Sequence, residues 1–392
     1  MKRWRIVATL ALALSLGVLV SDPAVGSRKA EERSMIDVNV LAIFKPTQVI
    51  LRGPLIYQHP DGLERRVPRV SLEATADGLR VDGEWIVGSV TFRPEDQSIT
   101  VSVMNGGQTA RMERDYQGPL TIRQKGKALQ MVTSLELEDY VAGVLASELP
   151  SGGPEARKAQ AILIRTYALR ADQRHAEADV CDLTHCQTYK GAADRQTRSL
   201  VRSTRGIVVK ADRALADVYY SSTCGGHTLD AKKAWPGSKV RHGSRGVPDK
   251  GPAGEVWCDA SPHFHWELEL SRAEVYQVLK GRWPQLQRDF SLTLKHDISG
   301  WVERVGLSQQ EQSMTGEAFH LLMGRGLGWG SFKSARFELQ VNAEGVFKFK
   351  GRGLGHGVGL CQHGALAQAE GGKSAREILK HYFPEWEVGP WE

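Results

Sequence analysis

Apolar residues recur at helical spacing along residues 137–145, and the recurrence ends at a carboxylate. The next position on this stripe is Glu148, and Pro150 follows two residues later, where its missing N–H opposes further helix. The spacing is that of a helix with one buried face. The apolar positions are Leu137, Tyr140, Val141, Val144 and Leu145. The pattern therefore predicts a helix that ends at Glu148, where an aliphatic side chain is expected.

A second helix is predicted directly after the first. Gly153 and Pro154 are typical of a helix N-cap and a first helical turn. The run AILIRTYAL, residues 161–169, is apolar on nearly every side, which indicates burial. Arg165 lies inside this run. A buried guanidinium needs an anion, either a protein carboxylate or a bound ligand, because an unpaired charge in the interior is very costly.

Strand patterns precede and follow these helices. Residues 36–132 alternate apolar and polar positions between turn residues, which predicts hairpins across residues 94–97 and across Lys125-Gly126. Later strand-like segments include a hairpin in FELQVNAEGVFKFKG, and helices are expected to open at Ser271 and to cover residues 374–383. The fold class expected is α+β, with a β-rich N-terminal region followed by a mixed α+β region.

The N-terminal residues 1–26 have the pattern of a secretory signal. Basic residues at positions 2, 3 and 5 precede an apolar run at residues 6–20 and a small-residue cleavage site at residues 24–26. The run is short for a membrane span, and an uncleaved anchor is the alternative. We expect an exported protein, located in the periplasm, the cell wall or at the cell surface.

The charge balance points to the class of partner. The net charge is +6, without a basic run interleaved with aromatic residues, so we do not expect a nucleic-acid partner. A basic exported protein fits an acidic polymer of the cell envelope better.

Four possible metal ligands occur within twelve residues. His175, Cys181, His185 and Cys186 have the ligand types and the number of a tetrahedral zinc site. If all four bind, no coordination position stays open, and the one zinc ion is structural. The alternative is a disulfide between Cys181 and Cys186, because the expected compartment is oxidising.

The chain has five cysteines, an odd number, so at least one is free, metal-bound or paired outside the chain. Cys224 and Cys258 are candidates for a disulfide across a long loop, or for two buried thiols. Cys361 stands two residues before His363, a spacing at which side chains diverge on a helix, so a thiol nucleophile with this base is not expected.

Glu148 and His356 are the strongest candidates for chemistry. A carboxyl at the end of an apolar stripe is partly desolvated, which favours the protonated form that a general acid needs. The alternatives for Glu148 are a surface glutamate and an ion pair with Arg165. The glycine-rich segment GRGLGHGVG, residues 351–359, lacks the context of a phosphate-binding loop, so we expect no nucleotide or organic cofactor. It provides a tight backbone path for His356 before a helix near Gln362, and ordinary packing is the alternative for His356.

Six segments in order resemble the SpoIID/LytB family, the stage II sporulation protein D and LytB-type amidase enhancers. They are EDYVAGVLASELP, KAQAILIRTYAL, CQTYKG, YYSSTCGGHT, SPHFHW and GRGLGHGVGLCQHGA. The resemblance covers residues 116–383. It implies a SpoIID-like domain with an extended glycan-binding groove at residues 116–392, which follows the expected signal peptide at residues 1–26 and the β-rich region at residues 27–115.

The resemblance also implies a reaction. The family's catalytic glutamate falls on Glu148 of Glu148-Leu149-Pro150, and the expected activity is that of a lytic transglycosylase. Such an enzyme cleaves the bond between N-acetylmuramic acid and N-acetylglucosamine in peptide-free peptidoglycan strands and leaves a 1,6-anhydro end. The residues then expected to bind the glycan are Arg165, Tyr189, His227, His356 and Gln362. The alternative is a non-catalytic peptidoglycan-binding enhancer of an N-acetylmuramoyl-L-alanine amidase, with that amidase as a partner.

Some family members bind zinc in the region of His175 and Cys186, and others do not. The chain departs from the family pattern at Leu149, where Met is usual, at Leu354, where Trp is common, and at Cys361, where Ser is common. The change at Leu354 weakens the expected stacking of a sugar.

Overall fold

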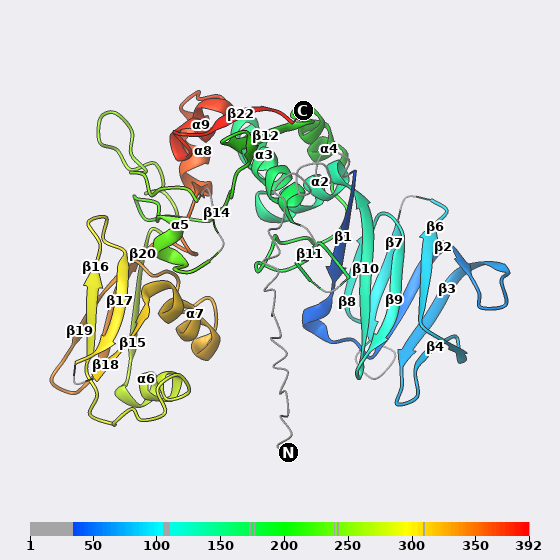
Figure 1. The fold of residues 1–392 in the computed structure, drawn as a ribbon, viewed down its shortest axis with the longest axis horizontal. Helices are drawn as coiled ribbons and strands as arrows, with labels where there is room; N and C mark the ends of the chain where they lie inside the picture. Colours follow the sequence, from blue (N-terminus) through cyan, green and yellow to red (C-terminus); the bar gives the residue numbers. More distant parts are fainter. Residues whose placement is uncertain are drawn as a thin grey trace, which may run out of the picture.

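The computed structural model describes residues 34–96, 98–104, 110–171, 174–175, 177–238, 240, 243–308 and 310–391. Figure 1 shows an arch in which a helical centre joins a β-rich N-terminal lobe to a second lobe of strands and helices. The predicted α+β class and the β-rich N-terminal region are confirmed. The predicted signal sequence lies outside the described residues. Within the described residues, no helix has the length and apolar character needed to cross a membrane.

The N-terminal lobe is built on an 11-stranded sheet with the order β11-β1-β10-β9-β6-β2-β3-β4-β5, and β7 pairs with β2 and β8. Its strands are β1 (Met35–Val40), β2 (Gln48–Gln58), β3 (Glu64–Ala74), β4 (Leu79–Val81), β5 (Glu84–Ile86), β6 (Ser89–Pro94), β7 (Ile99–Met104), β8 (Ala110–Tyr116), β9 (Leu120–Lys125), β10 (Ala128–Glu136) and β11 (Val180–Cys181). Their alternate side chains fill one large apolar core.

This sheet continues past the expected domain boundary at residue 116. β1 pairs antiparallel with β10 and parallel with β11, so the N-terminal strand lies between two strands from the later part of the chain. The boundary after residue 115 therefore falls inside β8 of one continuous sheet.

One predicted hairpin is confirmed and another is wrong. β9 and β10 form the hairpin across Lys125-Gly126. The chain, however, keeps its direction from β6 to β7, where a hairpin across residues 94–97 was predicted. β6 and β7 both pair antiparallel with β2, β6 at Leu55–Tyr57 and β7 at Val49–Arg52, on either side of the irregularity in β2. β6 and β7 are therefore two successive, collinear strands, because each pairs with a different part of the long strand β2.

The helical centre packs against this sheet. It contains α2 (Leu137–Glu148), α3 (Pro154–Arg170), α4 (Arg195–Arg202), α8 (Gln362–Glu370) and α9 (Ala375–Tyr382). Four positions of the predicted apolar stripe of α2 are buried and the first, Leu137, is half-buried, and α3 begins with Gly153 as N-cap and Pro154 in its first turn. Beside these helices lie the strands β12 (Ile207–Ala211), β13 (Ala214–Leu215) and β22 (Glu387–Pro390), the short parallel pair β14 (Tyr220–Ser221) and β21 (Leu360–Cys361), and the short helix α5 (Ala231–Ala234).

The second lobe contains two three-stranded sheets and two helices. Its elements are β15 (His265–Leu270), α6 (Arg272–Leu279), β16 (Leu292–His296), β17 (Val302–Leu307), β18 (Gln310–Thr315), α7 (Gly316–Leu327), β19 (Phe337–Val341) and β20 (Phe347–Arg352). β19 and β20 form the predicted hairpin. The predicted helix starts are also confirmed, since Ser271 and Ser374 each form a capping box with the glutamate three residues later.

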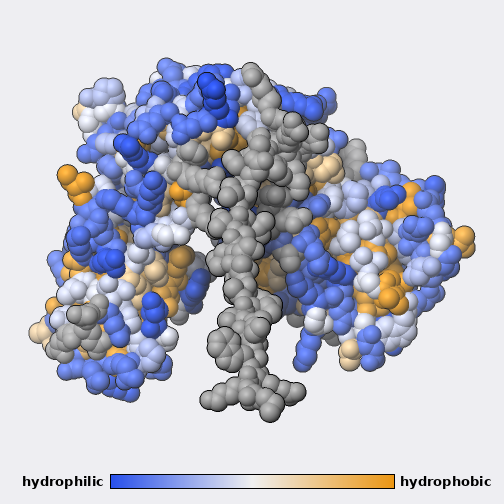
Figure 2. All heavy atoms as spheres, viewed as in Figure 1, coloured by the Kyte–Doolittle hydropathy of each residue, from blue (hydrophilic) through white to orange (hydrophobic). Residues whose placement is uncertain are grey.

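The surface polarity differs between the parts of the arch. Figure 2 shows mainly hydrophilic residues over the helical centre and apolar patches on the N-terminal lobe. A hollow of 440 Å³ lies on that lobe, lined by residues of β2, β3 and β6 that include Tyr57, Glu64 and Arg93. Glu148 is not among the residues that line this hollow. The extended glycan-binding groove therefore stays a prediction.

Candidate active site at the end of helix α2

Glu148 is the last residue of α2 and is half-buried. Its Oε1 accepts a hydrogen bond from the backbone N–H of Thr188 at 2.7 Å. Its carbonyl oxygen accepts one from Nε2 of Gln362, the first residue of α8, at 3.3 Å. Among the described residues, no cation forms an ion pair with Glu148 and no donor bonds to Oε2. The Thr188 bond thus fixes one carboxyl oxygen and the Gln362 bond fixes the backbone of the same residue, while Oε2 stays available.

The segment CQTYKG holds the end of α2 in place. The hydroxyl of Tyr140 donates to Oε1 of Gln187 at 3.0 Å, and the backbone N–H of Lys190 donates to Oγ of Ser147 at 3.1 Å. Gly191 adopts a φ of +113° and approaches Asp115 so closely that a Cβ would lie 2.2 Å from its carbonyl oxygen. The glycine of this motif is therefore required by backbone conformation and by packing.

Tyr189 is not a glycan contact, contrary to the expectation from the family motif. Its side chain is 1 % exposed and packs between the rings of Tyr116 and Tyr140, with centroids at 6.1 Å and 5.8 Å. Its role is to anchor the segment that presents the Thr188 N–H to Glu148.

Gly143 of α2 lies against this anchor, which gives a testable prediction. A Cβ at this position would lie 2.4 Å from Cε2 of Tyr189 and 2.6 Å from the carbonyl oxygen of Gly191. Overpacking should make Gly143→Ala less stable by about 1–3 kcal/mol, measured as the free energy of unfolding in urea. Gly281→Ala is the matched control, because a Cβ there meets no atom within 4 Å. Equal stability of the two variants would contradict this packing.

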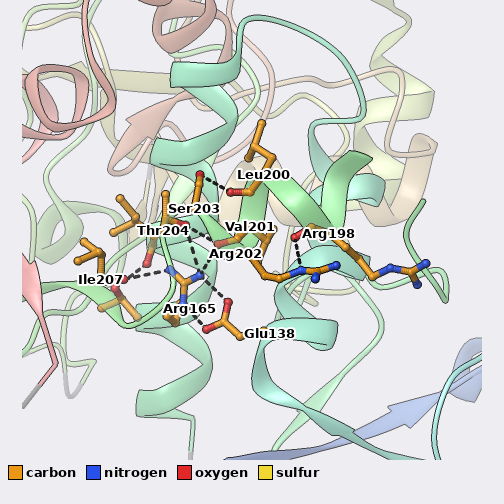
Figure 3. Close-up of polar contacts among 11 residues, drawn as sticks. Glu138, Arg165, Arg198, Leu200, Val201, Arg202, Ser203, Thr204 and Ile207 are labelled. Atoms are coloured by element: carbon orange, nitrogen blue, oxygen red, sulfur yellow. Dashed lines mark hydrogen bonds and ion pairs between the residues drawn. The ribbon is translucent and has the colours of Figure 1, made fainter. Parts of the chain in front are cut away.

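Arg165 has a different partner from those expected. Its Nε and Nη2 donate to the two carboxylate oxygens of Glu138 at 2.8 Å and 2.7 Å, a bidentate pair drawn in Figure 3. Its Nη1 donates to the carbonyl oxygen of Ile207 at 3.0 Å, and its side chain is 1 % exposed. The expectation that Arg165 orients Glu148 or binds a sugar is therefore wrong. The anion that its burial demands is a glutamate in the first turn of α2.

Tyr220 is a candidate that the sequence reasoning missed. It lies in β14, beside Leu360 of β21, and its hydroxyl is buried without a hydrogen-bond partner among the described residues. Burial raises its pKa well above the usual value, and the negative charge of Glu148 adds to the increase. Tyr220 therefore stays a neutral hydrogen-bond donor, and its pKa responds to the charge of Glu148. The sequence signal that could have identified Tyr220 was the motif YYSST, residues 219–223, which contains it.

His356 lies in an aromatic setting. Its ring is 5.2 Å from that of Trp235 and 6.4 Å from that of Tyr219. Its Nδ1 accepts a hydrogen bond from the backbone N–H of Val358 at 3.0 Å, and burial lowers its pKa. His356 is therefore held neutral, with its Nδ1 already in use.

His227 lies near a second tryptophan. Its carbonyl oxygen accepts a hydrogen bond from Nε1 of Trp301 at 2.9 Å, and its Nδ1 donates to the carbonyl oxygen of Thr228 at 2.7 Å. Burial lowers the pKa of His227. Among the described residues, no hydrogen bond or ion pair joins His227 or His356 to Glu148.

The four expected metal ligands do meet. One ligand atom each from His175, Cys181, His185 and Cys186 lies within 4.8 Å of the others, and both thiols are free. The distance from Nε2 of His175 to Sγ of Cys186 is 3.2 Å, and Nδ1 of His185 lies 3.8 Å and 3.5 Å from the two sulfurs. A tetrahedral zinc ion with these ligands has sulfur–nitrogen edges of about 3.5 Å. The residues fit such an ion, and a disulfide is not formed.

Comparisons with known proteins agree with the motifs. The SpoIID family model, described as Stage II sporulation protein, matches residues 125–210. The chain is 29 % identical over 277 residues to an uncharacterized protein of Brachyspira hyodysenteriae, covering 69 % of this chain and 71 % of the relative. It is 28 % identical over 288 residues to stage II sporulation protein D of Bacillus subtilis, covering 68 % and 78 %. It is 24 % identical over 291 residues to the amidase enhancer of Bacillus subtilis, covering 62 % and 39 %. These matches confirm the predicted relationship of the chain to the SpoIID/LytB family.

Proposed function

We propose that the protein is a peptidoglycan lytic transglycosylase that acts on peptide-free glycan strands. The observation that supports the proposal most strongly is the environment of the Glu148 carboxyl. Glu148 is half-buried and one carboxyl oxygen is fixed by the Thr188 N–H. Among the described residues, the other oxygen accepts no hydrogen bond and no cation forms an ion pair with the carboxyl. A positioned carboxyl of this kind is suited to give and take a proton.

In the proposed reaction, Glu148 acts first as an acid and then as a base. It protonates the glycosidic oxygen between N-acetylmuramic acid and N-acetylglucosamine, and the bond from that oxygen to C1 breaks. The C6 hydroxyl of the muramic acid then closes on C1, and the Glu148 carboxylate takes its proton. The products are a 1,6-anhydro end and a new 4-hydroxyl end, and Glu148 returns to its initial state without consuming water.

This reaction needs one carboxylate, whereas most glycoside hydrolases place two around the scissile bond. The described residues linked to Glu148 by a hydrogen bond are Thr188 and Gln362, and the charge of Glu148 acts on Tyr140 and Tyr220. None is a carboxylate. Tyr220 is the proposed neutral hydrogen-bond donor, and His227 and His356 are proposed to bind the glycan.

The second candidate function is a non-catalytic one. One relative is named an amidase enhancer, and the chain covers 39 % of that protein. In this alternative the protein binds glycan strands and stimulates an N-acetylmuramoyl-L-alanine amidase without cutting the strands itself. Both candidates act on the cell wall, so both require export, the role we propose for residues 1–26.

Strand cleavage by the purified protein separates the two functions. The substrate is peptidoglycan that an amidase has stripped of its peptides, with the amidase removed before the assay. We expect anhydro-ended fragments by mass spectrometry, and no cleavage of strands that still carry their peptides. Intact strands in both samples, with faster peptide release when an amidase is added back, would favour the enhancer.

We further propose that His175, Cys181, His185 and Cys186 hold one structural zinc ion. With four protein ligands, the ion supplies stability and leaves no position for substrate. Cys181 belongs to β11 of the large sheet, and Cys186 stands two residues before Thr188. The ligands therefore tie the segment that contacts Glu148 to the N-terminal sheet.

Metal analysis tests this ligand set. Cys181→Ser should lose one equivalent of zinc per chain relative to the wild type and should unfold at a lower temperature, because metal binding free energy contributes to folding. Ser71→Ala, on strand β3 far from the ligands, is the control and should retain its zinc. A stoichiometric disulfide between Cys181 and Cys186 in the purified protein would contradict the prediction.

A further inference from the structure

A second group of possible metal ligands is fully buried beside the start of α8. Cys224 follows β14, Asp249 and Cys258 lie in the loop between α5 and β15, and Cys361 ends β21. All four side chains are 0 % exposed. One ligand atom from each lies within 4.8 Å of the others, and all three thiols are free. We call these four residues the buried cysteine cluster.

The spacing of the ligand atoms fits a tetrahedron. The sulfurs of Cys224 and Cys258 are 3.8 Å apart, and Sγ of Cys224 lies 3.3 Å from Oδ2 of Asp249. A tetrahedral zinc ion with zinc–sulfur bonds of about 2.3 Å has sulfur–sulfur edges of about 3.8 Å and sulfur–oxygen edges of about 3.6 Å. The two sulfurs are therefore placed as ligands of one ion and are not bonded to each other.

The charge of Asp249 also calls for a cation. Its Oδ1 accepts a hydrogen bond from the hydroxyl of Tyr382 at 2.6 Å, but no described lysine, arginine or histidine forms an ion pair with it. A fully buried carboxylate without an opposite charge is very costly. A divalent metal ion supplies that charge, and the Tyr382 hydroxyl then orients the carboxylate ligand.

The backbone around Cys361 is arranged for a thiolate. Its sulfur accepts hydrogen bonds from the N–H groups of Cys224 at 3.3 Å and Gly364 at 3.4 Å. Gly364 also lets α8 approach the cluster, since a Cβ there would lie 2.4 Å from Oδ1 of Asp249. Two N–H groups directed at one buried sulfur offset the negative charge that the sulfur carries once a metal ion has displaced its proton.

We propose that Cys224, Asp249, Cys258 and Cys361 bind one zinc ion, or another divalent metal with affinity for thiolates, in a closed structural site. On binding, the thiols that become ligands release their protons to solvent. The ion joins the loop before β15 to the first turn of α8. The next residue, Gln362, donates to the carbonyl oxygen of Glu148, so the ion fixes α8 against the end of α2.

The test counts metal and thiols in the full-length protein purified without added chelator. Zinc per chain is measured by elemental analysis in the wild type, in Cys258→Ser and in the double variant Cys181→Ser/Cys186→Ser. The expected result is the loss of one equivalent in Cys258→Ser relative to the wild type. The double variant should retain one equivalent, because it lacks only ligands of the His175 set. Since zinc is counted directly, the result does not depend on an assay of catalysis.

Two measurements cover the case in which Cys258→Ser does not fold. Asp249→Asn keeps the size of the side chain and should release one equivalent of zinc to a competing chelator faster than the wild type does. A non-reducing peptide map of the wild type should find Cys224, Cys258 and Cys361 as thiols. A disulfide between any two of them, or equal zinc content in the wild type and Asp249→Asn after chelator competition, would overturn the proposal.

Discussion

Glu148→Gln should lower the rate of glycan-strand cleavage by about 10²–10⁴-fold, the contribution expected of a general acid and base. Glutamine keeps the length of the side chain and can still accept the 2.7 Å hydrogen bond from the Thr188 N–H. It cannot donate or take up the proton that the reaction moves. The loss should therefore appear in the rate of anhydro-end formation, measured by mass spectrometry, while binding to peptide-free strands is retained.

The matched control is Glu136→Gln, an exposed glutamate at the opposite end of the same helix. It should cleave strands at the wild-type rate. If Glu148→Gln also releases anhydro ends at that rate, Glu148 is not the catalyst and the proposed mechanism fails.

Glu138→Gln should destabilise the protein by about 3 kcal/mol, because it leaves the buried Arg165 guanidinium without an opposite charge. This value is at the lower end for a broken buried pair, since the Glu138 side chain is 18 % exposed and its partner 1 %. The pair joins the first turn of α2 to α3. The effect should appear as a reduced free energy of unfolding in urea, with Glu136→Gln again as control. Equal stability of Glu138→Gln and the wild type would contradict a structural role for Arg165.

The helices around the site could be predicted because their signals are local. The apolar stripe of α2, Pro150 after its end and Gly153-Pro154 at the start of α3 each act within a few residues. The connection between β6 and β7 shows the limit of such signals. Turn residues mark an interruption, but only the tertiary structure determines that β6 and β7 follow each other along β2.

The roles of Arg165 and Tyr189 depended on contacts that the sequence does not contain. Burial of Arg165 was predicted correctly from its apolar surroundings, but its partner Glu138 lies 27 positions earlier, and nothing in the pattern distinguished it from Glu148. Tyr189 stands in a family motif, which is compatible with glycan binding and with packing. Only its 1 % exposure decides between them.

The cysteines show a similar limit. Neighbouring positions suggested Cys181 with Cys186, and these do meet. Cys224 and Cys258 were considered as a pair, but Cys361 lies 137 positions after Cys224 and joins them only through the parallel pairing of β14 and β21. The buried Asp249 that completes this group carried no signal in the sequence.

The central claim, that Glu148 closes a 1,6-anhydro ring without water, is tested most directly by isotope labelling. Peptide-free strands are digested with the purified wild-type protein in H₂¹⁸O, and the new ends are analysed by mass spectrometry. The account predicts 1,6-anhydro ends that carry no ¹⁸O, with their formation lost in Glu148→Gln. New reducing ends that carry ¹⁸O would show hydrolysis, and strands left uncut would show that the protein is not the enzyme; either result would contradict the account.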